Sequence, residues 1–243
     1  MPNGETSMGF YEQLSEHYDK IFSTEPGELD FIAESLGKPE SLLDIGCGTG
    51  NKTELFKDRA NSITAFDSDQ TMIDLANSTH SAQNISYLAM DMRSISERFA
   101  PASFDAALCL GNTLVHITDP AAMSGTLAAI YGVLRKNGRL AVQILNYDRI
   151  LDRKVTALPT LEVDGISFAR SYSHNGELLG FDTELRVPGQ PPLRNSVPLY
   201  PLRPAALEEL LNQNGFKDVR LYGGFKGEAL TGDSFVVIAL AGK

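Results

Sequence analysis

Between about residue 41 and residue 145, short apolar runs alternate with longer segments in which apolar residues recur at helical spacing. This alternation predicts a mostly parallel β-sheet with helices packed on its faces. The short runs predict strands at 41–45, 62–66, 85–90, 104–110 and 138–145. The longer segments predict helices at 52–59, 70–78 and 121–134, the last ending in a Lys-Asn-Gly signal typical of a C-cap.

The pattern changes on both sides of this region. Ahead of it, residues 10–22 carry apolar side chains at helical spacing, which predicts a lid helix. After Tyr147 the apolar runs become short and alternating, and Asp-Gly, Asn-Gly and proline turns separate them, which predicts antiparallel hairpins. Helical period returns at 204–214, and two closing strands are predicted at 216–222 and 235–240.

The charge balance narrows the classes of function. The formal net charge is −10 and the sequence pI about 4.9, so a nucleic-acid backbone would be repelled unless a basic stripe overrode the average. The clusters at 57–59 and 135–139 hold too few cations for that, and we expect no nucleic-acid partner. Neither a secretory leader nor the roughly 18 apolar residues of a spanning helix is evident, so we expect a cytoplasmic protein without membrane contact.

Metal and thiol chemistry are not predicted. The four histidines, His17, His80, His116 and His174, are far apart, and none stands at metal-ligand spacing from a cysteine or carboxylate. The two cysteines lie in runs of apolar and small residues, which is typical of reduced, packed thiols.

Three alternate glycines follow the first predicted strand, in the segment Leu-Leu-Asp-Ile-Gly-Cys-Gly-Thr-Gly. Glycines at Gly46, Gly48 and Gly50, with Cys47 between the first two, let the backbone turn tightly and approach a ligand closely. Their spacing differs from the Gly-x-Gly-x-x-Gly of dinucleotide sites, which argues against an NAD(P)-dependent oxidoreductase. Asp44 at the end of the strand is awkward beside a diphosphate but suits a ligand with an ammonium group, such as S-adenosylmethionine.

The next two strands also end in acidic residues. Asp67 comes at about the spacing from the glycine loop at which a carboxylate accepts hydrogen bonds from ribose hydroxyls. Ser68 and Met72 open the following helix, and Met72 could pack on an adenine face. Asp91, followed by Met92, could accept a hydrogen bond from the adenine amino group. Any one of these carboxylates is also typical of a turn or an N-cap, so the prediction depends on their combination.

Taken together, the segment 44–50, Asp67 and Asp91 resemble the nucleotide-binding motifs of class I S-adenosylmethionine-dependent methyltransferases, and the similarity covers nearly the whole chain. The resemblance implies a Rossmann-like α/β fold with a seven-stranded, mostly parallel sheet, helices on both faces and an antiparallel last strand. Seven matches the five strands of the first region plus the two closing strands. An antiparallel β insertion is expected after the fifth strand.

We predict a single domain over 1–243, a length at which one core with an insertion is common. Its parts are N-terminal lid helices (1–37), a cofactor-binding core (38–148), an antiparallel insertion that covers the substrate (149–203), and a closing helix with the last two strands (204–243).

Within that family, the segments 109–116, 132–136 and 146–148 resemble glycine and glycine/sarcosine N-methyltransferases, as do Tyr200-Pro201 and 221–226. This resemblance implies a small-molecule acceptor, most simply an amine.

The same resemblance assigns roles to single residues. It implies that Leu110 and His116 contact the cofactor, that Asn112 contacts the substrate, and that Tyr18 and Tyr200 form the methyl-transfer pocket, with Tyr18 also touching the cofactor. If the acceptor is a hydroxyl, a base is required, and His116 is the nearest candidate. Each of two residues could instead have a structural role: His116 could brace the loop that contains it, and Tyr200 could anchor a turn.

One position departs from the pattern. Leu145 stands where glycine N-methyltransferases carry the arginine that clamps the amino-acid carboxylate, and leucine cannot pair with a carboxylate. Arg149, Arg170 or Arg203 could replace it from another direction. The sequence therefore leaves open whether the acceptor is an amine, an alcohol or a less polar molecule. It also leaves open whether the protein is a non-catalytic sensor that only binds S-adenosylmethionine. The oligomeric state is open as well, and a homo-oligomer is one alternative.

Overall fold

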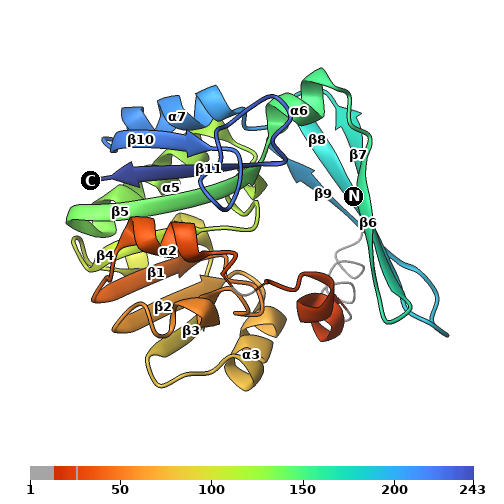
Figure 1. Cartoon of the computed structure of the whole chain (residues 1–243), viewed down its shortest axis with the longest axis horizontal. Helices are drawn as coiled ribbons and strands as arrows, with labels where there is room; N and C mark the ends of the chain where they lie inside the picture. The colour runs from red at the N-terminus through yellow and green to blue at the C-terminus, as the bar shows by residue number, and fades with distance from the viewer. Residues whose placement is uncertain (1–13, 26) are drawn as a thin grey trace.

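The computed structural model describes residues 14–25 and 27–243 and divides the strands between two sheets (Figure 1). The larger sheet has seven strands in the order β10-β11-β5-β4-β1-β2-β3. Strands β1 to β5 are parallel, whereas β11 runs antiparallel to both of its neighbours, β5 and β10. The predicted Rossmann-like sheet with an antiparallel last strand is therefore confirmed. The bounds are β1 (Ser41–Ile45), β2 (Ser62–Asp67), β3 (Ile85–Ala89), β4 (Phe104–Cys109), β5 (Leu134–Leu145), β10 (Lys217–Tyr222) and β11 (Val236–Gly242).

Helices cover both faces of this sheet, because successive strand residues point to opposite sides. In β4, Ala106 and Leu108 pack in the core beneath α2 (Asp30–Leu36), whereas Ala107 and Cys109 pack beneath α5 (Pro120–Val133) and α7 (Pro204–Gln213). The helix α3 (Gln70–Thr79) packs through Ile73 against β2. Short helical segments complete the set: η1 (Thr53–Phe56), η2 (Met92–Ser94), α4 (Ile95–Arg98), η3 (Leu114–His116) and α6 (Tyr147–Asp152).

The helices α3 and α5 each begin at a turn that an aspartate side chain caps. Asp69 accepts hydrogen bonds from the backbone N–H groups of Thr71 and Met72 and so starts α3. Asp119 accepts from Ala121 at the start of α5, where proline occupies the first turn. These caps fix the directions in which the chain leaves the carboxyl edge of the sheet.

The α-helix predicted at 52–59 is wrong, because only the 3₁₀ helix η1 forms there. The N–H groups of Leu55 and Lys57 bond to carbonyl oxygens three residues back. Only Thr53 and Phe56 of this segment are buried, so the apolar stripe that sustains an α-helix is missing.

The boundary between the fifth helix and the fifth strand also differs from the prediction. α5 ends at Val133 and β5 begins at Leu134, not at residue 138. Leu134 pairs with Phe104, and the register shifts before Arg139 pairs with Ala106. An irregularity within β5 therefore absorbs the Lys-Asn-Gly segment, which had indicated the C-cap of the preceding helix.

The second sheet is antiparallel, with the order β6-β7-β8-β9, as predicted for the insertion. Its inward face packs at one end against the larger core and at the other end against the helical residues 14–21, through contacts such as Phe168 with Leu14 and Ile21. Figure 1 shows this helix between the two sheets. Of the lid helix predicted at 10–22, residues 10–13 lie outside the described part. The bounds are β6 (Ala157–Val163), β7 (Ile166–Asn175), β8 (Leu178–Arg186) and β9 (Leu193–Leu199).

Candidate functional site

A cavity of about 570 Å³ opens at the carboxyl ends of β1, β2, β3 and β4. Each of these strands delivers a loop to its wall, since the carboxyl ends of parallel strands meet at one edge of a sheet. The volume lies within the range of roughly 300–1,000 Å³ usual for small-molecule sites. Among the residues predicted for the site, those that line the cavity are Tyr18, Gly46, Cys47, Gly48, Asp67, Ser68, Met72, Asp91, Met92, Leu110 and His116.

The glycine loop needs glycine for two physical reasons. Gly46 has φ +71°, and a Cβ there would lie 2.3 Å from Cγ2 of Thr113. Gly50 has φ +82°, and a Cβ there would lie 2.5 Å from the Tyr87 hydroxyl oxygen. Side chains are therefore excluded by backbone conformation and by space. At Gly48 the neighbour is Tyr18, whose ring covers the loop at ordinary contact distance.

Asp67 joins the end of β2 to the glycine loop. One carboxylate oxygen accepts a 2.9 Å hydrogen bond from the Gly48 N–H, and the other accepts one of 3.1 Å from Asp69. Burial raises the pKa of this carboxyl, and the backbone hydrogen bonds oppose the rise. The side chain is thus held in one orientation on the cavity wall.

Asp44 lies behind the loop and does not line the cavity. It is 4% exposed and accepts a 2.6 Å hydrogen bond from the Thr53 hydroxyl. Burial raises its pKa to about 6, although Thr53 and Lys52 favour the ionised form. Its direct contact with a ligand ammonium group stays a prediction.

The third strand supplies an acidic and an apolar contact. Asp91 caps η2 through the Arg93 N–H and forms a two-oxygen ion pair with the Arg93 guanidinium, whose hydrogen bonds hold the pKa of Asp91 below its usual value. Met90 and Met92 line the wall beside it, and the buried Met72 enters from α3.

His116 faces the cavity from η3, together with Leu110 at the end of β4. Desolvation by the surrounding protein lowers the pKa of His116, so the imidazole is neutral at physiological pH. A neutral imidazole can accept a proton.

Asn112 and Tyr200, like Gly50, do not line the cavity. The Asn112 side chain accepts a 2.9 Å hydrogen bond from the backbone N–H of Leu145 and donates one of 3.2 Å to the Tyr147 hydroxyl. Asn112 therefore ties the loop after β4 to the end of β5, with φ +65°. Tyr200 donates its N–H to the Val115 carbonyl and packs on the larger core. Their roles toward a substrate stay predictions.

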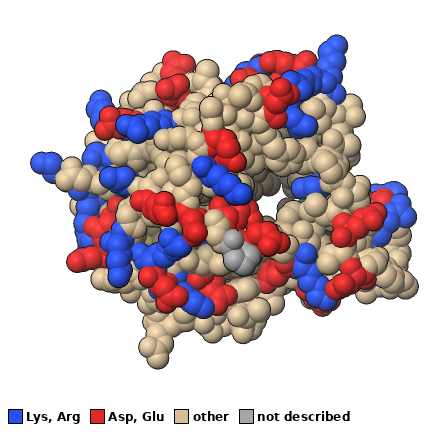
Figure 2. Space-filling view, viewed as in Figure 1, with Lys and Arg blue, Asp and Glu red and all other residues tan. Residues whose placement is uncertain are grey.

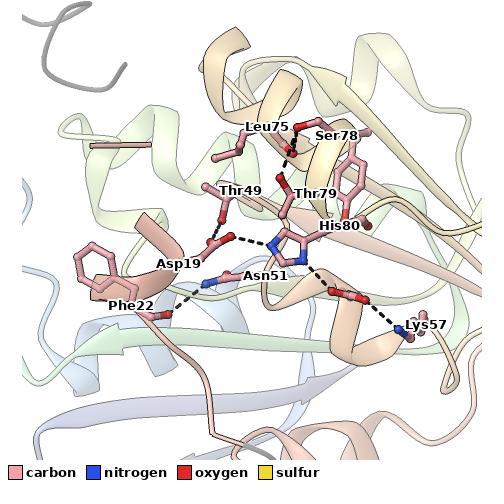
Figure 3. A network of polar contacts seen from close by, with 11 residues as sticks. Asp19, Phe22, Thr49, Asn51, Lys57, Leu75, Ser78, Thr79 and His80 are labelled. Carbon is pink, nitrogen blue, oxygen red and sulfur yellow. Dashed lines mark hydrogen bonds and ion pairs between the residues drawn. The ribbon is translucent and has the colours of Figure 1, made fainter. Parts of the chain in front are cut away.

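Sequence reasoning missed a polar network that fastens the helix 14–21 to the glycine loop (Figure 3). Its centre is His80, which bonds to Asp19 through Nε2 and to Glu54 through Nδ1, both at 2.7 Å. Asp19 also accepts a 2.5 Å hydrogen bond from Thr49 in the loop. These residues are 26 to 61 positions apart, and no local motif links them.

Two residues just beyond the glycine loop were missed as well. Asn51 lines the cavity and donates a 3.1 Å hydrogen bond to the Phe22 carbonyl, a second tie to the lid. Lys52 also lines the cavity, and burial lowers its pKa, although Glu28 and Asp44 attract the charge. The sequence signal that could have indicated these two residues as part of the site was their position directly after the third glycine.

Figure 2 shows the molecule hollowed between the larger core and the second sheet, with acidic side chains gathered along the core edge of this opening. Within residues 14–25 and 27–243, no helix is long and apolar enough to span a membrane. Among the same residues, no group of three or more metal-ligating side chains comes together.

Known proteins share this architecture. Residues 42–138 match the family model described as a methyltransferase domain. The glycine/sarcosine N-methyltransferase of Aphanothece halophytica is 26% identical over 232 residues, which cover 89% of this chain and 83% of that protein.

Two solved structures extend the similarity of fold. An S-adenosylmethionine-dependent methyltransferase from Clostridium acetobutylicum has a TM-score of 0.79 at 17% identity, covering 96% of this chain and 98% of that one. S-adenosylmethionine-bound CalS10, an amino pentose methyltransferase from Micromonospora echinaspora, has a TM-score of 0.67 at 19% identity, covering 99% and 98%.

Proposed function

Because the chain belongs to the class I S-adenosylmethionine-dependent methyltransferases, we propose that it methylates an amine nitrogen of a small-molecule acceptor. One observation carries the proposal: the cavity at the carboxyl edge of the sheet joins the glycine loop, Asp67 and Asp91 in a single wall. The relatives support the choice of nitrogen, since the protein from Aphanothece halophytica is named an N-methyltransferase.

The residues of the wall fit the cofactor. A backbone without side chains at Gly46 and Gly48 leaves room for close approach, and Asp67 presents fixed carboxylate oxygens to a ribose. Met72 and Met90 offer polarizable surface to an adenine ring. Lys52 would supply positive charge to the carboxylate of the cofactor's methionine part.

S-adenosylmethionine supplies an electrophilic methyl group on a sulfonium when bound. The chain must then hold the acceptor nitrogen in line with that methyl group and exclude water. Tyr18 packs over Gly48 and beside Phe22 at a ring-centroid distance of 4.7 Å, and it lines the cavity from the lid side. The acceptor must react as a neutral amine, and His116 on the cavity wall is our candidate to take the proton that the methylated nitrogen gives up.

A hydroxyl acceptor is the second candidate, and His116 is the observation that favours it. Methylation of a hydroxyl needs a base at the reacting oxygen, and the lowered pKa of His116 keeps its imidazole unprotonated. Amine and hydroxyl acceptors differ in how strongly they depend on that base.

Calorimetric titration with S-adenosylmethionine and S-adenosylhomocysteine, followed by release of S-adenosylhomocysteine in the presence of pooled small amines and alcohols, tests the proposal. Saturable binding with turnover on amines is the expected result. Binding without turnover on any pool would favour a sensor, turnover on alcohols alone would favour the second candidate, and absence of binding would refute the assigned cavity.

A further inference from the structure

Beyond the cavity, β7 carries two polar side chains on its inward face. Arg170 and Tyr172 are two residues apart and therefore point to the same side of the sheet. Tyr172 is 6% exposed and packs in the larger core, together with Leu158 of β6 and Leu199 of β9. The face is apolar at both of its ends, and Arg170 lies between these ends.

The polar atoms of these two side chains are buried without partners. Neither the Tyr172 hydroxyl nor Nε of Arg170 has a hydrogen-bond partner, and both atoms are shut off from solvent. The guanidinium makes one hydrogen bond, of 2.7 Å, from Nη2 to the Pro159 carbonyl. Buried donors without partners are rare in native proteins, which indicates that a ligand group completes them.

The other arginines near the site are arranged differently. Arg203 is neutralised by Asp148 at 2.5 Å and Asp152 at 2.9 Å. Arg149 lies on α6 with its guanidinium 5.6 Å from the centre of the Phe235 ring. Over the described part of the chain, no carboxylate comes within ion-pair distance of Arg149 or Arg170. Arg149 and Arg170 therefore differ from Arg203, whose charge is paired with two carboxylates.

The loop after β4 lies between the cofactor cavity and the core that holds Tyr172. Leu110 and His116 line the cavity, and Asn112 between them bonds to the Tyr147 hydroxyl. Tyr147 and Tyr172 belong to the same buried core. Burial raises the pKa of Tyr172 to about 12, and Arg170 and Arg149 oppose the rise, so its hydroxyl remains a donor within electrostatic reach of both guanidiniums.

We propose that Arg170 and Tyr172 bind an anionic group on the methyl acceptor, such as a carboxylate or a phosphate. The inference rests on the proposed function and adds the chemical class of the acceptor: an amine that carries a negative charge at its other end. A guanidinium Nε and a phenolic hydroxyl both donate hydrogen bonds to an oxyanion. Arg149 adds long-range attraction for the anionic group of the acceptor. Without such cations, the acidic side chains at the core edge of the opening (Figure 2) would repel that group.

The test observes the arginine Nε–H signals by NMR in protein saturated with S-adenosylhomocysteine, with the Arg170 signal assigned from R170K. Sodium acetate and sodium phosphate are titrated separately, with sodium chloride at equal ionic strength as the control. Saturation with S-adenosylhomocysteine is established first by calorimetry. Failure at that step refutes the proposed function, and the anion titration of the free protein still reports on Arg170.

A saturable shift of the Arg170 signal with acetate or phosphate, and not with chloride, is the expected result, while the Arg203 signal stays in place because its carboxylates already hold it. Tighter binding of acetate indicates a carboxylate acceptor, and tighter binding of phosphate a phosphorylated one. Y172F should weaken the anion about 5-fold to 10-fold, as for loss of one hydrogen bond, whereas R203Q should leave the affinity unchanged. An Arg170 signal that does not saturate with either anion, or that moves equally with chloride, overturns the proposal.

Discussion

Replacing His80 with alanine tests how the lid is held over the glycine loop. The His80 ring connects three separate elements: the helix 14–21 through Asp19, η1 through Glu54, and its own position at the C-cap of α3 (Figure 3). H80A removes both 2.7 Å hydrogen bonds and leaves Asp19 with its bond to Thr49. The lid should therefore dock less firmly while the sheet stays intact.

The size of the effect follows from burial. A hydrogen bond to a charged group contributes about 1.5–3 kcal/mol when buried. Here the side chains of Asp19 and Glu54 are 31% and 33% exposed, so we discount each bond to about 1 kcal/mol. Only the bond to Asp19 joins the lid, because Glu54 lies on η1. Its loss gives about 1 kcal/mol, or about a 5-fold change in the docking equilibrium of the lid.

The contribution of His80 also depends on pH. Burial alone would lower the pKa of His80, but the hydrogen bonds with Asp19 and Glu54 outweigh it and raise the pKa above 6.5. A group whose pKa is raised on folding stabilises the folded state fully when the pH is below the group's pKa in the unfolded chain. This stabilisation is lost as the pH rises through the pKa in the folded protein. The lid of the native protein should thus loosen above about pH 6.5, and that loosening should be absent in H80A.

Hydrogen exchange of the amides at 18–22 measures the docking equilibrium directly. Protection there should fall about 5-fold in H80A at pH 6, while the core strands remain unchanged. The matched control is H174A, because His174 lies exposed on β7. The reasoning is refuted if H80A keeps the native protection at 18–22, if H174A loses as much, or if the pH dependence survives in H80A. Asp44, which titrates near pH 6, is common to both proteins and cancels in the comparison.

Four further predictions concern the cavity. D67A should weaken S-adenosylhomocysteine about 10-fold to 100-fold in calorimetry through lost charge-assisted hydrogen bonds, and native affinity would remove Asp67 from the cofactor site. G46A should lower the melting temperature by roughly 4–8 °C in a thermal scan, because a Cβ would meet Thr113 and φ is +71°; an unchanged temperature would contradict the contact. H116A should reduce kcat/KM by about 100-fold or more for a hydroxyl acceptor and much less for an amine, and equal losses would show that His116 is no selective base. L145R should allow turnover of glycine in the S-adenosylhomocysteine release assay, and if glycine remains inert, Leu145 is not what excludes it.

Several features of the site could be predicted because the information is local. The run from Asp44 to Gly50 joins the end of a strand to a tight turn within seven residues, and the acidic residues at the ends of β2 and β3 follow from the strand pattern alone. Parallel strands then bring Asp67 and Asp91 to the same edge as the glycine loop. The structure places both on the cavity wall for that reason.

Other features depend on long-range packing, which a single sequence does not encode in a readable way. His80 meets Asp19 across 61 positions, and the isolated histidine carried no signal of a network. The helical pattern at 52–59 failed because only Thr53 and Phe56 are buried there, which leaves too narrow an apolar stripe for an α-helix. The hydrogen bond from the Leu145 N–H to the Asn112 side chain is likewise a long-range contact, and the predicted contact of Asn112 with the substrate stays a prediction.

The separation of the two sheets bears on how acceptor specificity can change. The glycine loop, Asp67 and Asp91 all lie at the carboxyl edge of the larger sheet, whereas Arg170 and Tyr172 lie on β7 of the smaller one. Substitutions on the inward face of β7 can therefore alter the charge offered to an acceptor without touching the residues proposed to hold the cofactor. A reaction that requires alignment more than acid–base chemistry tolerates such changes, since the in-line geometry is set by the cofactor cavity and by the lid that closes it. Leu145 carries no charge at the end of β5, and the partnerless Nε of Arg170 lies on the second sheet. We therefore propose that the positive charge offered to an acceptor comes from the second sheet.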